Sequence, residues 1–451
     1  MKTRRVARMV MAAAVLVWAF PVSSAPGASD WPYWRGPAAD GMAVGDAPVT
    51  WSGTENVRWK TDIPGLGHSS PVVWGDFIFL TTAIRTGTPA PAPASPAPDS
   101  AAQDGRSRGP GGGSGPQAEH NFDVLALDRK TGRILWQRTA KTAVPHEGGH
   151  NTYGSFASNS PVTDGRHVYA FFGSRGMYCY DFSGKLVWQR DFGVQMRMRM
   201  AFGEGTAPVL HGDRLVLVFD HEGDSFMAVL DKNTGKDIWR VSRDEPSNWS
   251  APLVTTFNKR TEVIVAATNR VRSYDLESGK VIWECGGLGS NPIPQPVRQD
   301  DMVFVMTGHR NPMLMAIRLG REGDLTGTDA VVWSKTRGNS YTPSPVIHDN
   351  KFYAVTDNGM VSCYNARTGE PYYQQVRLPK TYSFKSSPVG ANGKLYLATE
   401  NEDVVVLRMG ETFEVLATNT MTDQVFIATP AVAGGEIFLR SKTTLFCIRK
   451  S

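Results

Sequence analysis

One short pattern recurs along this chain, and it constrains the fold more than any other feature. In its clearest copy, residues 230–239, an apolar strand ends at Asp231, a turn ends at Gly235, and a second apolar run ends at Trp239. The short Asp side chain can hydrogen-bond forward into the turn, and Gly accepts the positive φ that closes a hairpin. Copies of the pattern occupy residues 127–136, 180–188 and 274–283, with weaker copies at 317–333 and 364–373. A hairpin repeated at a near-fixed period indicates a repeat protein.

A second marker counts the repeats. A small or polar residue followed by Pro occurs eight times, at Ser70-Pro71, Ser160-Pro161, Ala207-Pro208, Ala251-Pro252, Gln295-Pro296, Ser344-Pro345, Ser387-Pro388 and Thr429-Pro430. Pro suits the first residue of a strand, because its missing N–H costs no ladder bond there. Successive prolines are 42 to 49 residues apart, except for a first gap of 90. With the hairpin, each unit holds four strands, which is typical of a propeller blade.

The two ends of the repeat region complement each other. The last unit stops after a strand at residues 444–448 and lacks its fourth strand, whereas residues 57–61 form a fourth strand without a blade. We therefore predict an all-β, eight-bladed β-propeller of four-stranded antiparallel blades over residues 57–451. The N-terminal strand completes the last blade and closes the ring, which removes exposed sheet edges.

The hairpins place a column of large side chains at one position of every blade. The column contains Trp59, Trp136, Trp188, Trp239, Trp283, Trp333, Tyr373 and Leu416. We interpret it as packing between blades. Three of the four cysteines, Cys179, Cys363 and Cys447, share another column, of small residues. They lie in different repeats, as does Cys285, so we predict no disulfide.

The segments outside the repeats indicate export. Residues 1–28 have a basic start and an apolar core too short to span a bilayer comfortably, which predicts a cleaved signal peptide. The Arg4-Arg5 pair leaves a twin-arginine signal open. We expect a periplasmic or secreted monomer with no transmembrane segment in the mature chain. Removing the signal lowers the formal net charge from +5 to about +1, and no basic run follows, so nucleic-acid binding has no support.

Two further segments interrupt or precede the repeats. Residues 29–56 contain Trp31-Pro-Tyr-Trp34-Arg-Gly-Pro37 and are expected to form an ordered, irregular N-terminal segment with aromatic anchors. Residues 85–119 are rich in Pro, Gly and Ala and explain the long first gap. Such a composition cannot bury a core, so we predict a disordered insertion within the first blade.

The hairpins, the Ser-Pro-Val strands and the eight units resemble the pyrroloquinoline-quinone (PQQ)-like propeller repeat family over roughly residues 57–450. Residues 31–37 and the loop at 323–328 look like a secreted bacterial branch of it. The resemblance implies one of two kinds of function. Quinoprotein alcohol dehydrogenases hold PQQ and Ca²⁺ at the mouth of such a propeller, whereas the lipoprotein propeller of outer-membrane protein assembly binds partners. This chain has neither the adjacent cysteine pair and Cys-x-x-Cys-His haem motif of the first nor the lipidated Cys of the second.

The loops before the Pro strands should ring one mouth of the central channel. Their aromatic, amide and cationic side chains make a default binding site: His68, His150, Asn151, Tyr153, Arg199, Asn248, Trp249, Asn291, Tyr341 and Lys385. Trp249 lies outside the packing column and can stack on a flat ligand. The alternative is that these side chains only cap the channel and bind water. Carboxylates for Ca²⁺ are scarce there, with Glu147 and Glu204 the obvious ones.

Two other motifs receive structural interpretations. His146-Glu-Gly-Gly-His150 has the spacing of a zinc-protease helix, but Pro145 and two interior glycines disfavour a helix. Asp324 and Asp329 are expected to lie in a solvated turn. We predict no metal ligand and no catalytic residue.

The function expected from the sequence is that of a non-catalytic platform. It would bind an envelope protein or a glycan in the periplasm or envelope and need no cofactor. The alternative is a PQQ- and calcium-dependent quinoprotein dehydrogenase that oxidises an alcohol or a sugar.

Overall fold

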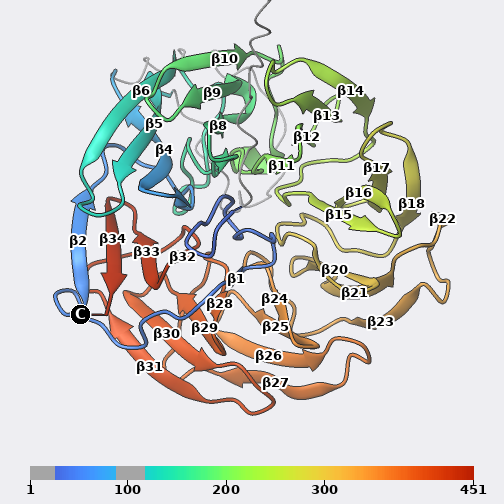
Figure 1. Cartoon of the computed structure of the whole chain (residues 1–451). Coiled ribbons are helices and arrows are strands. Elements are labelled where there is room, and N and C mark those ends of the chain that lie inside the picture. The colour runs from blue at the N-terminus through green and yellow to red at the C-terminus, as the bar shows by residue number, and fades with distance from the viewer. Residues whose placement is uncertain (1–25, 88–116, 451) are drawn as a thin grey trace, which may run out of the picture.

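The four-stranded unit predicted from the repeats is the building block of the fold. The computed structural model describes residues 26–87 and 117–450, and its strands form eight separate sheets arranged in a ring (Figure 1). Within each blade the first three strands follow chain order outward from the channel, and all neighbouring strands of the four-stranded unit are antiparallel. The predicted all-β, eight-bladed propeller is confirmed.

The blades use the strands in sequence. Blade 1 consists of β3 (Val72–Trp74), β4 (Phe77–Arg85), β5 (His120–Asp128) and β6 (Ile134–Ala143), and blade 2 of β7 (Val162–Thr163), β8 (His167–Phe171), β9 (Met177–Asp181) and β10 (Leu186–Arg190). Blade 3 consists of β11 (Val209–His211), β12 (Arg214–Phe219), β13 (Phe226–Asp231) and β14 (Asp237–Ser242). Blade 4 consists of β15 (Leu253–Phe257), β16 (Arg260–Val265), β17 (Val271–Asp275) and β18 (Val281–Cys285). Two short 3₁₀ turns, η1 (Gly173–Arg175) and η2 (Arg199–Ala201), lie in loops.

Blades 5 to 8 complete the circle. Blade 5 consists of β19 (Val297–Gln299), β20 (Met302–Thr307), β21 (Met313–Arg318) and β23 (Val331–Lys335), and blade 6 of β24 (Val346–His348), β25 (Lys351–Val355), β26 (Met360–Asn365) and β27 (Pro371–Arg377). Blade 7 consists of β28 (Val389–Ala391), β29 (Lys394–Ala398), β30 (Asp403–Arg408) and β31 (Val415–Thr420). Blade 8 consists of β32 (Ala431–Ala433), β33 (Glu436–Arg440), β34 (Thr444–Arg449) and β2 (Val57–Asp62).

The ring is closed by the N-terminal strand, as the sequence predicts. β2 pairs antiparallel with β34, and Trp59 lies opposite Cys447 in the register. The last sheet therefore joins residues from both ends of the repeat region. Within the described residues, each blade therefore has at least four strands.

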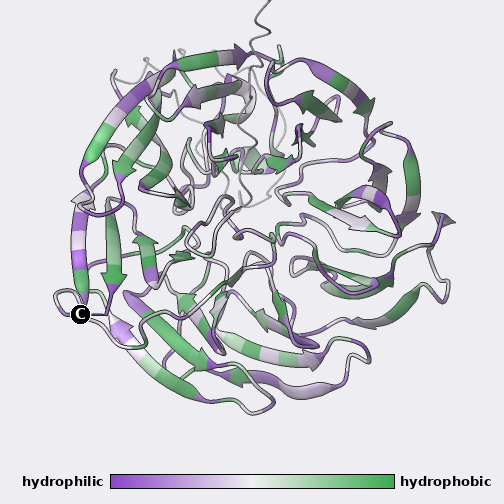
Figure 2. Ribbon diagram, viewed as in Figure 1, coloured by the Kyte–Doolittle hydropathy of each residue, from purple (hydrophilic) through white to green (hydrophobic). Residues whose placement is uncertain are grey.

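The middle strands carry the core, and the outermost strands face water on one side. β34 is buried at every position except Arg449, whereas β6 exposes or half-exposes every residue but Trp136. Figure 2 shows the same contrast, because β34 is mostly hydrophobic and β6 alternates in hydropathy. Burial between neighbouring blades is therefore the main source of cohesion.

The indoles of the Trp column join most of their blades to the next blade. The indole N–H of Trp188 donates a 2.8 Å hydrogen bond to the carbonyl of Lys232 in the following blade's hairpin turn, and Trp136 and Trp239 repeat the contact one blade before and after. The turn glycine, Gly235, lies against the same ring. Its backbone is in the left-handed region, with φ +68°. A Cβ there would come within 2.6 Å of the Trp188 ring. Glycine is thus required both by backbone conformation and by the indole beneath it.

Blade 5 departs from this arrangement because its turn is longer. β22 (Gly323–Asp324) leaves that turn and adds a short parallel strand outside β18 of blade 4. The Trp283 indole therefore bonds within its own blade, to the Glu262 carboxylate. In the same turn, Asp324 pairs with Arg270 at 3.0 Å and Asp329 with Arg321 at 3.4 Å.

The N-terminal segment crosses one end of the channel. It appears in blue over the middle of the ring in Figure 1. Trp31 forms an antiparallel bridge with Val73 of blade 1, and β1 (Met42–Ala43) adds a parallel strand inside β28 of blade 7. We call residues 26–56 the plug. It is ordered and anchored by aromatic side chains, since Trp31 is fully buried.

A buried arginine fixes the middle of the plug. The Arg35 guanidinium donates hydrogen bonds to the carbonyls of Pro388 (2.8 Å) and Pro345, in blades 7 and 6. These two prolines are the marker prolines that precede the inner strands of their blades. The plug is therefore tied to the inner strands of blades 1, 6 and 7.

The ends of the predicted insertion adjoin the blade 1 ladder. Arg85 pairs with His120, and the Thr86 N–H donates to the Glu119 carbonyl. The antiparallel ladder holds these residues in place. Residues 88–116 of the predicted insertion and residues 1–25 of the predicted signal peptide lie outside the described residues.

The remaining sequence expectations concern cysteines and the membrane. All four cysteines are free and buried. Over residues 26–87 and 117–450, no helix has the length and apolar character needed to cross a bilayer.

Candidate functional site

The channel has two different mouths. Because each strand reverses direction, the loops before the inner strands and the turns after them lie at opposite ends of the ring. We call these ends the loop mouth and the turn mouth. The plug covers the turn mouth, where Asp30 accepts a hydrogen bond from the N–H of Gly75 in a turn after an inner strand. The loop mouth is the one predicted to carry the binding site.

A cavity of about 170 Å³ lies in the channel at the loop mouth. Its lining residues come from all eight blades and the plug: Trp34, His68, Ser70, Tyr153, Ser158, Ser160, Gly205, Ala207, Trp249, Ala251, Ile293, Thr342, Ser344, Lys385, Ser387, Ile427 and Thr429. Trp34 of the plug is among them, so the plug contributes to this cavity as well as to the turn mouth. None of the lining residues is acidic, and Lys385 is the one that carries a full charge.

Four predicted site residues line this cavity: His68, Tyr153, Trp249 and Lys385. The Lys385 ammonium lies 4.7 Å from the centre of the Tyr153 ring, a cation–π distance. Burial, reinforced by nearby cations, lowers the pKa of His68 to about 3, so this imidazole is neutral. The Trp249 indole N–H donates to the Gly203 carbonyl at 2.8 Å, which fixes the ring at the cavity wall.

Four more predicted residues form the rim above the cavity. His150 stacks on Tyr153 with ring centres 4.7 Å apart. Tyr341 stacks on His309 at 5.0 Å and also contacts Asn291. Burial raises the pKa of Tyr341, and the positive charge of Arg199 partly opposes the rise. The backbone N–H of Arg199 donates to the Ser247 hydroxyl at 2.8 Å. These side chains come from four different interblade loops, which the fold brings to one mouth.

The structure places the two remaining predicted residues differently. Asn248 is buried, and its amide is used within the scaffold: its NH₂ donates to Asp220 and to the Ala266 carbonyl, and its oxygen accepts from the Ser250 N–H. It shapes the loop that carries Trp249 and does not line the cavity. Asn151 is exposed in the same loop as His150.

Sequence reasoning missed a belt of hydroxyl groups around the cavity. The N–H of Ser344 donates to the Ser387 hydroxyl at 2.9 Å, that of Ser387 to Thr429 at 3.1 Å, and that of Thr429 to Ser70 at 3.0 Å. Ser70 continues the belt to Ser160 at 2.8 Å. All are the residues before the marker prolines. The recurring hydroxyl before Pro was the available signal, although it was interpreted only as a strand start.

Rim residue Asp357 is a second omission. Its carboxylate accepts the N–H groups of Tyr341 (2.8 Å) and Thr342 (3.1 Å) and pairs with Lys385 at 3.1 Å. It therefore positions two loops and the lysine. It lies outside the cavity lining.

The zinc-protease motif does not assemble a metal site. The Nε2 atom of His146 lies 2.8 Å from the Met196 carbonyl, whereas His150 stacks at the rim. Glu147 accepts a hydrogen bond from the Met198 N–H. Glu204 binds Arg175 at 2.7 Å. Among the described residues, no group of three or more His, Cys, Asp or Glu side chains could hold a metal ion.

Glu147 gives the loop mouth a pH dependence. Burial, with Glu204 adding to it, raises the pKa of Glu147 from 4.5 to about 7, although the Met198 N–H and Arg175 oppose the rise. Between these two values the folded state binds a proton that the unfolded chain has lost. The stability due to the protonated carboxyl is therefore fully present below pH 4.5 and is lost as the pH rises through 7.

We expect Glu147→Gln to remove this dependence. The wild-type protein should lose about 1 kcal/mol more unfolding free energy than the variant between pH 5 and 8, a small effect because the carboxyl is half exposed and water screens it. Urea unfolding at the two pH values measures the difference. Parallel losses in both proteins would show that Glu147 does not titrate as described.

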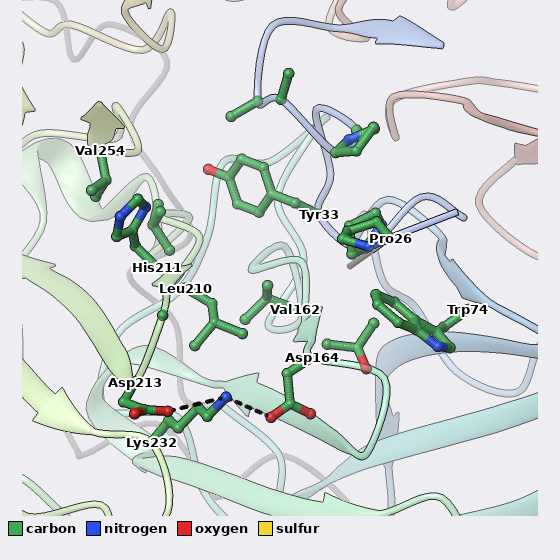
Figure 3. Close-up of a pocket in the computed structure, with 18 residues that line it drawn as sticks. Pro26, Tyr33, Trp74, Val162, Asp164, Leu210, His211, Asp213, Lys232 and Val254 are labelled. Atoms are coloured by element: carbon green, nitrogen blue, oxygen red, sulfur yellow. Dashed lines mark ion pairs between the residues drawn. The ribbon is translucent and has the colours of Figure 1, made fainter. Parts of the chain in front are cut away.

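A larger hollow, of about 580 Å³, lies at the turn mouth between the plug and blades 1 to 4 (Figure 3). Tyr33 and Trp74 form part of its wall. Lys232 bridges Asp164 and Asp213 at 3.1 and 3.4 Å, as the dashed lines show. The lysine charge is therefore compensated on both sides. None of the predicted site residues lines this hollow.

Comparisons with known proteins agree with this architecture. Residues 120–375 and 323–415 match the family described as "Outer membrane protein assembly factor BamB". The outer membrane protein assembly factor BamB of Yersinia pestis is 19% identical over 335 residues, which cover 71% of this chain and 78% of the relative.

Two solved structures share the fold. BamB from Moraxella catarrhalis superposes with a TM-score of 0.54 at 12% identity, covering 87% of this chain and 98% of that one. Quinohemoprotein alcohol dehydrogenase from Comamonas testosteroni superposes with a TM-score of 0.60 at 9% identity, covering 93% and 80%. At these identities the likeness shows the fold alone.

Proposed function

Because this chain belongs to the propeller family described as outer membrane protein assembly factor BamB, we propose that it is an exported, non-catalytic binding platform of the bacterial envelope. Its loop mouth holds an envelope protein or a glycan. The observation that carries the proposal is the convergence of Tyr153, Trp249, Tyr341 and Lys385, from four interblade loops, on one concave mouth.

The scaffold around the mouth is suited to binding without rearrangement. Ring closure, the Trp column and the hydroxyl belt each fix neighbouring blades relative to one another. A preformed site loses little conformational freedom when it binds, which favours affinity. The plug supports Trp34 from the opposite end of the channel, so a ligand enters from the loop mouth.

The rival function is that of a quinoprotein dehydrogenase, which the fold of the Comamonas enzyme favours. Bound PQQ would supply the hydride-accepting chemistry. The residues here do not fit PQQ with Ca²⁺. The cavity of about 170 Å³ is smaller than the roughly 300 Å³ that a ligand of the size of PQQ needs, and none of its lining residues offers a carboxylate for Ca²⁺.

Reconstitution separates the two functions. Purified protein incubated with PQQ and Ca²⁺ is expected to show no dye-linked oxidation of alcohols or aldoses and no retained cofactor after desalting. A matched quinoprotein dehydrogenase serves as the positive control. Turnover that depends on both PQQ and Ca²⁺ would replace the platform with the dehydrogenase.

Photo-crosslinking tests the platform directly. A benzophenone amino acid at rim position Tyr341 is expected to form envelope crosslinks in cells. The same group at Leu186, exposed on the outer strand of blade 2, should form none of the same products. Trp249→Ala should reduce the Tyr341 products severalfold, because it removes an aromatic contact at the mouth. Identical products from both positions would contradict binding at the loop mouth.

A further inference from the structure

The belt hydroxyls are held in one orientation and retain a donor. Each belt hydroxyl accepts a hydrogen bond from one backbone N–H; the five residues are Ser70, Ser160, Ser344, Ser387 and Thr429. For Ser344 the donor is the N–H of Gln295. None of the five O–H groups donates a hydrogen bond to another described residue. All five side chains are more than nine-tenths buried and line the cavity. Blades 6, 7, 8, 1 and 2 thus present a continuous arc of five O–H donors to the channel.

Two buried cations lie behind this arc. The Arg35 guanidinium bonds the carbonyls of Pro345 and Pro388, each directly after a belt residue. Arg440 is 1% exposed and donates to the carbonyl of Ser69 at 2.9 Å, next to the belt residue Ser70. Its Nε and Nη2 atoms have no hydrogen-bond partner among the described residues. Neither arginine forms an ion pair with a described carboxylate, so their charge adds to the field in the channel.

The arginines stay charged at neutral pH. Burial lowers the pKa of Arg440 to about 9 and that of Arg35 to about 10, both still above 7. Lys385 adds a third cation at the cavity itself, although its charge is shared with the rim carboxylate of Asp357, 3.1 Å away. Two unpaired arginines, this paired lysine and five O–H donors therefore surround a cavity whose lining residues include no acid.

The opposite side of the cavity is apolar. Blades 3 and 4 place Ala207 and Ala251 where other blades carry the belt hydroxyls, and Trp34, Trp249 and Ile293 complete this side. A ligand with two unlike ends would match the two sides. The volume of about 170 Å³ holds roughly five to six water-sized groups.

We propose that the loop-mouth cavity binds an oxyanion group, such as a carboxylate, sulfonate or phosphate, with the apolar part of its carrier against the indoles of Trp34 and Trp249. This inference rests on the proposed function and names the chemistry by which the platform holds its ligand. A ring of O–H donors backed by the unpaired charges of Arg35 and Arg440 stabilises an anion, and a lysine at the cavity adds a charge-assisted hydrogen bond.

Calorimetric titration of the purified protein tests the anion. Benzoate is expected to bind, and benzyl alcohol, which carries the same ring but no charge, to bind at least tenfold more weakly. Sulfate and phosphate distinguish an inorganic source of the oxyanion from an organic one. They should bind more weakly than benzoate because they cannot use the apolar wall. All titrations use equal ionic strength, so that general salt effects cancel.

Variants separate the two sides of the cavity. Lys385→Met should weaken benzoate and sulfate about tenfold, because one charge-assisted bond is lost. Trp249→Ala should weaken benzoate and leave sulfate unchanged. The double variant S344A/S387A should weaken both anions, whereas Ser250→Ala is the matched control. The Ser250 hydroxyl is buried in the same ring but donates to the Pro294 carbonyl and does not line the cavity.

The outcomes decide the proposal. Equal affinity for benzoate and benzyl alcohol, or benzoate affinity unchanged in both Lys385→Met and S344A/S387A, would overturn it. Circular dichroism checks that each variant is folded. The crosslinks at Tyr341 do not depend on these titrations. Crosslinks without anion binding would reject the oxyanion and keep the platform, and anion binding without crosslinks would reject the platform.

Discussion

Replacing Trp59 with alanine is expected to lower the free energy of unfolding by about 3–5 kcal/mol, the usual cost of removing a buried tryptophan. Trp59 is only 9% exposed, although it belongs to an outermost strand. Its indole N–H donates to the Arg129 carbonyl at 2.9 Å, and its ring lies against Gly132 in the hairpin turn of blade 1. The same residue sits on β2, so it links the closing strand of blade 8 to blade 1.

Lys60 provides the control on the same strand. Its side chain is exposed, so Lys60→Ala should change the unfolding free energy by no more than about 0.5 kcal/mol. Urea unfolding followed by tryptophan fluorescence and circular dichroism measures both variants. If Trp59→Ala unfolds at the same urea concentration as Lys60→Ala, the join between the first and last strands contributes little to stability.

Substituting alanine for Gly235 should destabilise the protein by about 2–5 kcal/mol. Two costs add together. The positive φ of +68° costs an L-residue roughly 1–2 kcal/mol, and a Cβ would lie 2.6 Å from the Trp188 ring, an overlap that typically costs 1–3 kcal/mol. The indole cannot retreat easily, because its N–H is bonded to the Lys232 carbonyl.

Gly393 isolates the steric part of this effect. It has nearly the same φ, +71°, but no atom lies within 4 Å of the position that a Cβ would occupy. Gly393→Ala should therefore cost only the roughly 1–2 kcal/mol of the backbone conformation. The difference between the two variants in urea unfolding measures the contact between glycine and indole. Equal losses at both positions would show that the Trp column does not restrict the turn glycines.

Much of the fold could be predicted because its signals are local. The Asp-to-Gly turns specify hairpins within ten residues, and their period specifies the blade. The Trp column could be assigned to packing because it recurs at one position of every hairpin. The weaker hairpin copy at residues 317–333 did not predict the added strand β22, since Gly323 and Asp324 carry no strand pattern.

The candidate site could be predicted only in outline. The loops before the Pro strands were correctly expected to share a mouth, because a closed ring leaves them no other place. Which side chains of those loops face the cavity was a separate question. Trp249 and Asn248 are adjacent, but one lines the cavity and the other is bonded inside the loop. Asn248 bonds to Asp220 and Ala266, which directly follow strands β12 and β16, so the sequence around the loop gives no signal that separates these two roles.

The sequence by itself therefore determined the number of blades, the closure of the ring and the mouth that carries the interblade loops. Each follows from turn chemistry and period, which act over a few residues. Only the tertiary structure decided the chemistry of the channel. Arg35 meets the carbonyls of Pro345 and Pro388, more than 300 residues away, and the belt hydroxyls meet one another across blade boundaries. Such contacts depend on where distant strands come to lie, and a chain read in order contains no local signal for that.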